Sequence, residues 1–418
     1  GGGQLPHPRD ISGKKKEGAW ERFRTRCKEM TMTIMTPYEL MEKLISFPTV
    51  SRDPNTDLID WVESYLAAHG IVSHRHWRDE ARTHCALFAH VGPEIEGGVV
   101  LSGHTDVVPV EGQPWRSDPF TVTERDGKYF GRGTCDMKGF DALAIWALVE
   151  AKRRGVTRPL QIALSYDEEV GCTGAPAMIE AMQGVLPKAE LAIIGEPSLM
   201  KCVNGHKGGV GVATHVVGFE VHSSIMHRGV SAVMEAAKLL EWANEVNAQN
   251  MVATPDALAA MFDPPWTNAH VGTIEGGTAN NITAKDCKFI MGFRVVPSEN
   301  KQDWVERYTA RAREVEAEMQ AIHPEARIDL TGFFDVPGLK PEEHGVAENF
   351  VRRLTGDNAS HVVSYGTEAG QFQEAGYSAV ICGPGSIEQA HQPDEYITIA
   401  EFEAGQRFIE RLLEELAA

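Results

Sequence analysis

Apolar and polar positions along the chain predict helices and short buried strands in alternation. Residues 36–48 open with Thr-Pro-Tyr-Glu, which combines a threonine N-cap, a proline at the first helical position and a glutamate at the third, and apolar residues then recur at helical spacing. A second helix is predicted at 57–68, just before Gly70. Compact apolar runs, each followed at once by polar residues, predict buried strands at 98–101, 160–164, 191–194 and 379–382.

Helical patterns such as 140–149 separate these strands, and the alternation predicts an α/β domain with a largely parallel sheet covered by helices on both faces. In sheets of this kind, ligands bind beyond the carboxyl ends of the strands. We therefore expect a site among the polar residues that follow the predicted strands.

The middle of the chain has another pattern. β-rich stretches at 210–221, 269–274 and 286–296 are interleaved with helical stretches at 230–248 and 298–319. This order predicts a small α+β sandwich of the ferredoxin-like kind, inserted into the larger domain, with a return to that domain near Ile328. We accordingly divide the chain into a leader, a first part of the larger domain, the inserted domain and a second part of the larger domain, at 1–35, 36–206, 207–322 and 323–418.

Composition narrows the class of protein. A chain of 418 residues exceeds the length at which single cores stop growing, which agrees with two domains. No apolar run is long enough to span a membrane, and the formal charge of -19 argues against binding to nucleic acids or anionic membranes. The seven cysteines are scattered without a CxxC pair, which is typical of reduced cytoplasmic proteins.

The start of the chain has a composition of its own. Residues 1–29 are rich in Gly, Lys and Arg and lack the apolar region of a secretory signal. We expect residues 1–35 to be either a disordered leader or an added segment.

A set of acidic residues and histidines has the chemistry of a two-metal hydrolytic site. Its members are His104, Asp106, Asp136, Glu168, Glu169, Glu196 and His391. Such a site needs imidazole and hard oxygen ligands, a carboxylate that bridges both ions, and a free carboxylate that takes a proton from water. In His104-Thr105-Asp106 the carboxylate can orient the imidazole, as carboxylates do beside metal-bound histidines.

Taken singly, these residues have simpler interpretations. Asp136 opens a helix and could be its N-cap, while the glycines around it fit neither a Walker motif nor a dinucleotide motif. Glu168 and Glu169 could be solvated carboxylates on a turn. Glu196 follows four apolar residues, and a buried carboxylate needs a cation or hydrogen-bond donors. The pattern alone leaves these interpretations open.

Longer strings around these residues resemble a known family. They are SGHTDVVPVEGQPWRSDPF (102–120), YFGRGTCDMKGF (129–140), DEEVGCTGA (167–175), GEPS (195–198) and GPGSIEQAHQPDEY (383–396). From Pro37 to the C-terminus the chain is similar to the dinuclear-zinc family of acetylornithine deacetylases, succinyl-diaminopimelate desuccinylases, aminoacylases and glutamate carboxypeptidases. The first and last strings look most like the acetylornithine deacetylase branch.

The resemblance implies two divalent metal ions, zinc or alternatively cobalt or manganese. The residues implied as ligands are His104, Asp136, Glu169, Glu196 and His391. His104 and Glu196 would hold one ion, Glu169 and His391 would hold the other, and Asp136 would bridge the two ions. The resemblance also implies a homodimer, formed through the inserted domain, which serves as a lid.

Further residues gain roles from the same resemblance. Asp106 would orient the imidazole of His104, and Glu168 would be the general base. In the inserted domain, His222 before Ser-Ser matches a histidine that reaches the active site, often from the partner subunit, and polarises the scissile carbonyl. Arg294 matches the arginine that holds the substrate carboxylate, and Asn280 matches a polar substrate contact. The residues after Ser-Ser lack the Pro and Asn that are common in relatives.

The family implies hydrolysis of an N-acylated amino acid, and the branch indicates N2-acetyl-L-ornithine, cleaved to L-ornithine and acetate in arginine biosynthesis. We expect Glu368, in Tyr-Gly-Thr-Glu-Ala, to pair with the side-chain ammonium of ornithine. A desuccinylase, or a broader N-acyl-amino-acid hydrolase or carboxypeptidase, is the alternative within the same chemistry. A non-catalytic family member is the alternative from another class, and the complete ligand set argues against it.

Overall fold

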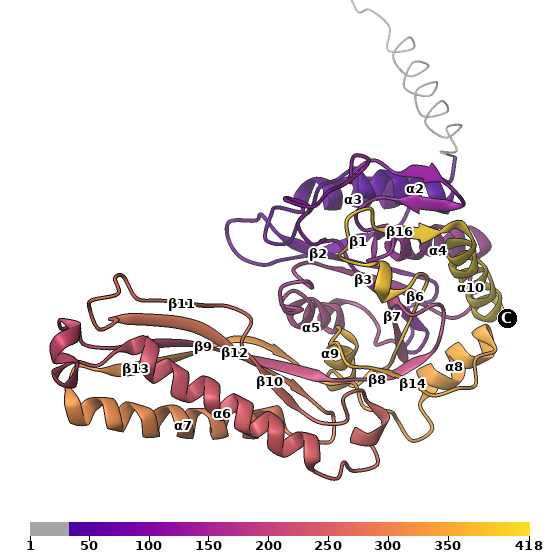
Figure 1. Ribbon diagram of the computed structural model, residues 1–418. Coiled ribbons are helices and arrows are strands. Elements are labelled where there is room, and N and C mark those ends of the chain that lie inside the picture. Colours follow the sequence, from indigo (N-terminus) through magenta and orange to yellow (C-terminus); the bar gives the residue numbers. More distant parts are fainter. Residues whose placement is uncertain (1–32) are drawn as a thin grey trace, which may run out of the picture. The chain divides into compact units, whose positions relative to one another are not determined.

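Three β-sheets organise the protein in the computed structural model, which describes residues 33–418 (Figure 1). Most of the predicted leader, at 1–35, lies outside the described residues. Thr36–Ala418 form one unit. Among the described residues, no helix is both long enough and apolar enough to cross a lipid bilayer.

The largest sheet has eight strands in the order β1-β2-β6-β3-β7-β15-β8-β14. Their bounds are Ser73–Trp77 (β1), Cys85–Val91 (β2), Val99–His104 (β3), Leu160–Ser165 (β6), Leu191–Pro197 (β7), Val203–His206 (β8), His361–Val363 (β14) and Ser378–Gly383 (β15). The central strands β6, β3, β7 and β15 are parallel, whereas β1 and β2 add antiparallel pairs at one edge. The predicted parallel sheet is confirmed at its centre, and each predicted strand is present in it.

Helices pack on both faces of this sheet, as the alternating pattern predicts. Their bounds are Pro37–Ile45 (α2), Thr56–Ala68 (α3), Lys138–Arg154 (α4), Ala175–Val185 (α5), Val346–Thr355 (α8), Ala369–Glu374 (α9) and Ile399–Ala417 (α10). α4 and α10 lie together on one side, and α5 and α9 on the other (Figure 1). Every residue of β3, β6 and β7 is buried, which is why these strands are continuous apolar runs in the sequence.

The first helix begins as its sequence predicts. Thr36 Oγ1 accepts a hydrogen bond from the backbone N–H of Glu39 at 3.3 Å, and Glu39 Oε2 accepts one from the backbone N–H of Thr36 at 2.7 Å. These reciprocal bonds satisfy donors that the start of a helix leaves without partners. The capping box fixes where the described fold starts.

The inserted domain is an antiparallel sheet with two long helices on one face (Figure 1). Its elements are β9 (Gly208–Val217), α6 (Ala232–Val252), β10 (Asn268–His270), β11 (Ile274–Gly276), β12 (Asp286–Val295), α7 (Lys301–Ile322) and β13 (Arg327–Val336). The short 3-10 helices of the protein are η1 (Ser223–Arg228), η2 (Ala259–Met261) and η3 (Ile387–Gln389). The stretch predicted as one strand at 269–274 is divided between β10 and β11.

The last strand of the inserted sheet lies beyond the predicted boundary. β13 pairs with β9 from Arg327 opposite Val217 to Val336 opposite Gly209. The sequence pattern places the return to the larger domain at 323, near Ile328. Alternating burial marks a strand but does not show which sheet it joins, so we now propose that the inserted domain ends after Val336.

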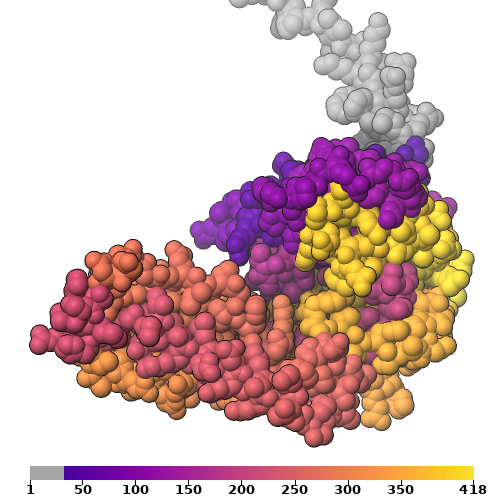
Figure 2. Space-filling view, viewed as in Figure 1, coloured from indigo at the N-terminus to yellow at the C-terminus, as the bar shows by residue number. Residues whose placement is uncertain are grey.

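The smallest sheet joins the two parts of the larger domain. It is antiparallel and consists of β16 (Tyr396–Thr398), β5 (Lys128–Phe130) and β4 (Thr123–Arg125). Figure 2 shows the result, since early residues in purple and late residues in yellow share one surface. This contact brings the C-terminal segment close to the loop that follows β5.

Candidate metal centre

The predicted ligands meet where the central strands of the large sheet end. His104 is the last residue of β3, and Glu196 lies near the end of the neighbouring β7. Glu168 and Glu169 follow β6, which flanks β3 on its other side. Because these strands are parallel, their carboxyl ends lie at one edge of the sheet and bring the side chains together.

Asp136 lies between the two imidazoles of the cluster. Its Oδ1 is 3.0 Å from His104 Nε2, and its Oδ2 is 3.2 Å from His391 Nε2. Glu169 Oε2 is 3.0 Å from His391 Nε2, and Glu196 Oε1 is 3.8 Å from His104 Nε2. Each imidazole therefore has one oxygen of Asp136 beside it, and His104 Nε2 also lies 4.0 Å from Glu168 Oε2. The structure thus brings the five residues implied as ligands together around Asp136.

The loop that carries Asp136 is held by a carboxylate from the C-terminal segment. Glu395 is 1% exposed and accepts hydrogen bonds at 3.1, 3.0 and 3.0 Å from the backbone N–H groups of Gly133, Cys135 and Asp136. The same carboxylate pairs with Arg132 at 2.7 Å. Neither Glu395 nor Arg132 has a predicted role, although both belong to the strings that resemble the family. Helix α4 has no side-chain cap, so Asp136 is not its N-cap.

Asp106 contacts His104 and also shapes the turn that carries the two adjacent glutamates. His104 Nδ1 lies 2.9 Å from the backbone oxygen of Asp106 and 3.5 Å from its Oδ1. The Asp106 carboxylate accepts hydrogen bonds from the backbone N–H groups of Glu168 at 3.1 Å and Glu169 at 3.3 Å, and from the Ser51 hydroxyl at 2.6 Å. With Nδ1–H donated to Asp106, the Nε2 atom of His104 is available as a ligand.

Burial gives the acidic groups of the cluster unusual proton affinities. Burial, followed by the charge of Asp136, raises the pKa of Glu196 well above its usual value and that of Glu169 to about 7. Burial also raises the pKa of Glu168 well above its usual value, against the opposing effect of His104. For Asp136, burial would raise the pKa, but hydrogen bonds from the two imidazoles hold it below the usual range.

The donor set fits divalent cations. Ligand atoms of His104, Asp136 and Glu169 all lie within 4.8 Å of one another, and so do those of His104, Glu168 and Glu196. Imidazole nitrogens and carboxylate oxygens are ligands that zinc binds in proteins. Buried acidic groups this close together need positive charge to remain ionised. The cluster is therefore a candidate metal centre.

A cavity of about 550 Å³ opens onto the cluster. Arg294, from β12 of the inserted domain, lines it together with Phe334 of β13 and Tyr365. Arg52 is also part of the wall, and no motif in the sequence indicates this. Within the described residues, neither Arg52 nor Arg294 forms an ion pair, so both guanidinium groups can receive an anionic group of a ligand.

Two predicted residues of the inserted domain do not reach this cavity. His222 is exposed at the start of η1, where its Nδ1 lies 2.8 Å from the Ser224 hydroxyl. It follows the end of β9 that is distant from Arg294, which pairs with Gly209 at the other end. A strand of ten residues is about 30 Å long. Asn280 is exposed in the loop before β12, close to the same distant end.

Glu368 is not placed to bind a substrate ammonium. Its side chain is 1% exposed and does not line the cavity. The hydroxyls of Ser102 in β3 and Ser165 in β6 donate hydrogen bonds to its two carboxylate oxygens. The predicted contact is contradicted because the chain turns into α9 at Glu368 and buries the carboxylate behind the strand ends. The sequence does not show toward which side of that turn the side chain points.

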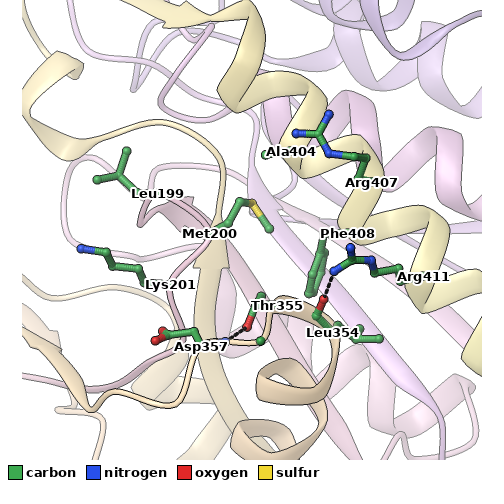
Figure 3. A pocket seen from close by; sticks show the side chains of 11 residues that line it. Leu199, Met200, Lys201, Leu354, Thr355, Asp357, Ala404, Arg407, Phe408 and Arg411 are labelled. Atoms are coloured by element: carbon green, nitrogen blue, oxygen red, sulfur yellow. Dashed lines mark hydrogen bonds between the residues drawn. The ribbon is translucent and has the colours of Figure 1, made fainter.

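A second cavity lies away from the cluster. It measures about 380 Å³ and is bounded by α8, α10 and the segment after β7 (Figure 3). In its wall, Arg411 donates a hydrogen bond at 2.7 Å to the backbone oxygen of Leu354, in the last turn of α8. This arginine thus has a structural partner, and the cavity contains none of the residues predicted for the site.

A mixed α/β sheet with a histidine and carboxylate cluster at its strand ends, next to an inserted α+β domain, defines a metal-dependent hydrolase. Residues 100–415 match peptidase family M20/M25/M40, and this range contains the whole cluster. The chain belongs to this family. It is an amide hydrolase, as the sequence predicts.

Curated relatives agree with the branch that the strings indicate. The acetylornithine deacetylase of Myxococcus xanthus is 32% identical over 374 residues, which cover 88% of this chain and 94% of the relative. The acetylornithine deacetylase of Pasteurella multocida (strain Pm70) is 34% identical over 375 residues, which cover 87% of this chain and 93% of the relative. The predicted resemblance is confirmed.

Solved structures share the fold at lower sequence identity. The M20 family metallo-carboxypeptidase Sso-CP2 from Sulfolobus solfataricus has a TM-score of 0.73 and 15% identity, and the match covers 91% of this chain and 99% of that one. A dinuclear metal-binding peptidase of the M20 family from Bacillus subtilis has a TM-score of 0.60 and 15% identity, with coverage of 95% and 99%. The predicted fold class is confirmed.

Proposed function

We propose that the protein removes the acyl group from N-acylated amino acids, with N2-acetyl-L-ornithine as its substrate. The observation that carries this proposal is that one cavity is lined by Glu168, by Arg294 and by four of the five residues implied as metal ligands: Asp136, Glu169, Glu196 and His391. The relatives named acetylornithine deacetylase support the choice of substrate. The products are L-ornithine and acetate, in arginine biosynthesis. The cysteines of the described residues are all unpaired, which supports a cytoplasmic location.

We further propose that the cluster holds two divalent cations, with zinc as the first choice and cobalt or manganese as alternatives. His104 and Glu196 would hold one ion and Glu169 and His391 the other, and Asp136, which lies between the two imidazoles, would serve both, in agreement with the distances among these side chains. When bound, such cations act as Lewis acids and lower the pKa of a bound water from 15.7 toward about 7.

Glu168 is the proposed general base. Its Oε2 is 4.0 Å from His104 Nε2 and the residue lines the cavity, so the carboxylate faces the cluster. It takes a proton from the attacking water and gives it to the departing amine.

Arg294 is the proposed partner of the substrate α-carboxylate. It extends from a central strand of the inserted sheet into the cavity and has no competing ion pair among the described residues. Two parallel N–H donors of a guanidinium match the two oxygens of a carboxylate. Binding at this point fixes the position of the substrate relative to the cluster, because β12 is held by strands on both sides.

A homodimer through the inserted domain is also part of the proposal. His222 lies too far from the cluster of its own protomer, so we propose that it serves the site of a partner subunit and donates a hydrogen bond to the developing oxyanion. Large apolar side chains in η1, at the start of α6 and in the loop before β12 have exposed fractions between 39% and 61%: Ile225, Met226, Val233, Met234 and Ile282. Exposed apolar patches of this kind mark protein interfaces.

Arg52 favours a second candidate function. An additional unpaired guanidinium in the cavity suits a substrate with a second carboxylate, such as a succinylated amino acid. The burial of Glu368 removes the carboxylate expected to meet an ammonium. These two observations keep a desuccinylase as the alternative.

Steady-state hydrolysis of matched acyl amino acids tests the proposal. The purified chain is loaded with zinc or cobalt and given acetyl-ornithine, acetyl-norvaline and a succinylated diamino acid at equal concentration. Preference for acetyl-ornithine supports the proposal, and preference for the succinylated compound supports the alternative. Glu168→Gln should bind metal like the wild type and lose at least about a thousandfold in kcat, since it lacks the base. A variant that keeps wild-type kcat contradicts the assigned base.

A further inference from the structure

The Cys172 thiol contacts the side chain proposed as the general base. Its Sγ lies 3.2 Å from Oε1 of Glu168, a hydrogen-bond distance for a sulfur donor. The other oxygen, Oε2, is on the side of the cluster, 4.0 Å from His104 Nε2. The thiol is 3% exposed and forms part of the cavity wall. One oxygen of Glu168 therefore has a fixed partner, and the other faces the reacting groups.

The backbone around Cys172 is held at several points. The backbone N–H groups of Gly171 and Cys172 donate to the backbone oxygen of Glu168 at 3.0 and 2.8 Å, which closes a tight turn. The backbone oxygen of Cys172 accepts a hydrogen bond from Gln371 Nε2 at 3.0 Å. The thiol is thus presented to Glu168 by a turn that is tied both to the base itself and to helix α9.

The conformation of Cys172 gives a second, independent observation. Its φ is 52°, in the left-handed region that residues with a β-carbon rarely adopt. Glycine would take this conformation at lower cost, and the preceding residue, Gly171, is a glycine with positive φ. A side chain at position 172 is therefore present at some cost in backbone energy, and its thiol is in contact with Glu168.

We propose that Cys172 is a positioning residue for the hydrolytic reaction, and that its thiol holds Oε1 of Glu168 so that Oε2 faces the attacking water. This inference rests on the proposed role of Glu168 as the base. In this scheme Cys172 acts through Glu168 and takes no part in bond making or breaking. A carboxylate with one oxygen fixed loses less rotational freedom when it takes the proton, which favours the transition state over the bound substrate.

Three substitutions distinguish positioning from simple space filling. Cys172→Ser keeps a hydrogen-bond donor, and Cys172→Ala removes the donor. Cys172→Gly also removes the donor and lowers the energetic cost of the positive φ at this position. We expect Ala and Gly to lower kcat about tenfold, the loss expected for one hydrogen bond, with KM within about twofold of the wild type. We expect Ser to restore at least half of the wild-type kcat. Cys172→Gly should melt no lower than Cys172→Ala.

Controls separate this inference from the proposed function. Cys202→Ala removes another buried thiol, whose Sγ lies 4.0 Å from the backbone oxygen of Glu348, and should leave kcat unchanged. If Glu168→Gln is inactive but Cys172→Ala keeps wild-type kcat, the inference is overturned and the proposed function stands. If Glu168→Gln remains active, the proposed base fails and the inference fails with it. A serine variant as slow as the alanine variant also overturns the inference.

Discussion

Arg132 and Glu395 form an ion pair of 2.7 Å with side chains that are 1% and 0% exposed. The pair contacts the loop that carries Asp136, and Glu395 also accepts a hydrogen bond from the backbone N–H group of Asp136 itself. A proposed metal ligand is therefore positioned by a buried charge from the C-terminal segment of the chain. Burying two charges is costly, and either charge left alone costs much more.

Glu395→Ala should destabilise the fold strongly. It leaves the Arg132 guanidinium buried without its counter-charge, and breaking a buried pair in this way costs about 3–5 kcal/mol. Urea unfolding of the metal-free protein measures the loss. Arg116→Ala is the matched control, because Arg116 pairs with the adjacent Asp394 but is 68% exposed, and such pairs contribute little. Equal losses in the two variants would contradict the argument from burial.

Metal binding should stabilise the protein. Burial and neighbouring carboxylates raise the pKa values of Glu169 and Glu196, and cations favour the ionised form of these groups. We expect removal of divalent ions with a chelator to lower Tm, and zinc at a hundred times its Kd to restore about 2.7 kcal/mol. Glu196→Gln should reduce this gain, whereas Glu94→Gln, at a side chain 79% exposed, should not. A Tm that is indifferent to metal would remove the candidate centre.

Arg294→Lys should weaken the binding of substrate more than it slows the chemical step. Lysine keeps the charge but loses the paired donors of the guanidinium, so we expect kcat/KM to fall about 10- to 100-fold, mostly through KM. Steady-state kinetics on the preferred acyl amino acid measures the effect. Lys288→Ala, on the same strand but outside the cavity, serves as the control. An unchanged KM in the Arg294 variant would mean that another group binds the carboxylate.

The sequence predicts the grouping of the candidate metal centre better than the substrate contacts. The proposed ligands His104 and Glu196 lie at the ends of apolar runs, and because parallel strands end at one edge of a sheet, the pattern of the chain predicts that these side chains lie close together. Glu368 follows no such rule, because it lies on a turn whose direction depends on the packing of α9. Its burial against Ser102 and Ser165 could be found only in the folded chain.

Contacts between segments that are distant in the sequence account for the other differences between the predictions and the structure. Glu395 and Arg132 are ordinary charged residues in the sequence, and their burial depends on the pairing of β16 with β5. The edge strand β13 has the alternation of any half-buried strand, and only its partner shows which domain it belongs to. For His222, the sequence gives the residue type but not the length of β9 that separates it from the cluster.

His206 should make the fold sensitive to mild acid. Its Nδ1–H donates to the backbone oxygen of Lys207 at 2.8 Å, and its Nε2 accepts the backbone N–H of Gly370 at 3.2 Å, which leaves no acceptor for a second proton. Burial lowers the pKa of His206 to about 4, against about 6.5 in an unfolded chain. The unfolded state therefore binds the proton first as the pH falls. The contribution to stability is complete above pH 6.5 and is lost between about 6.5 and 4.

The size of the effect follows from the same two pKa values. Between pH 7 and pH 5 this one group should cost the wild type about 2 kcal/mol of unfolding free energy. His206→Gln removes the titration, so the stability difference between wild type and variant should shrink by that amount over the same interval in urea unfolding. Taking the difference cancels the contribution of the metal ligands, which both proteins share. His344→Gln, at a side chain 90% exposed, should keep the wild-type pH dependence, and an identical pH dependence in His206→Gln would show that His206 does not titrate as argued.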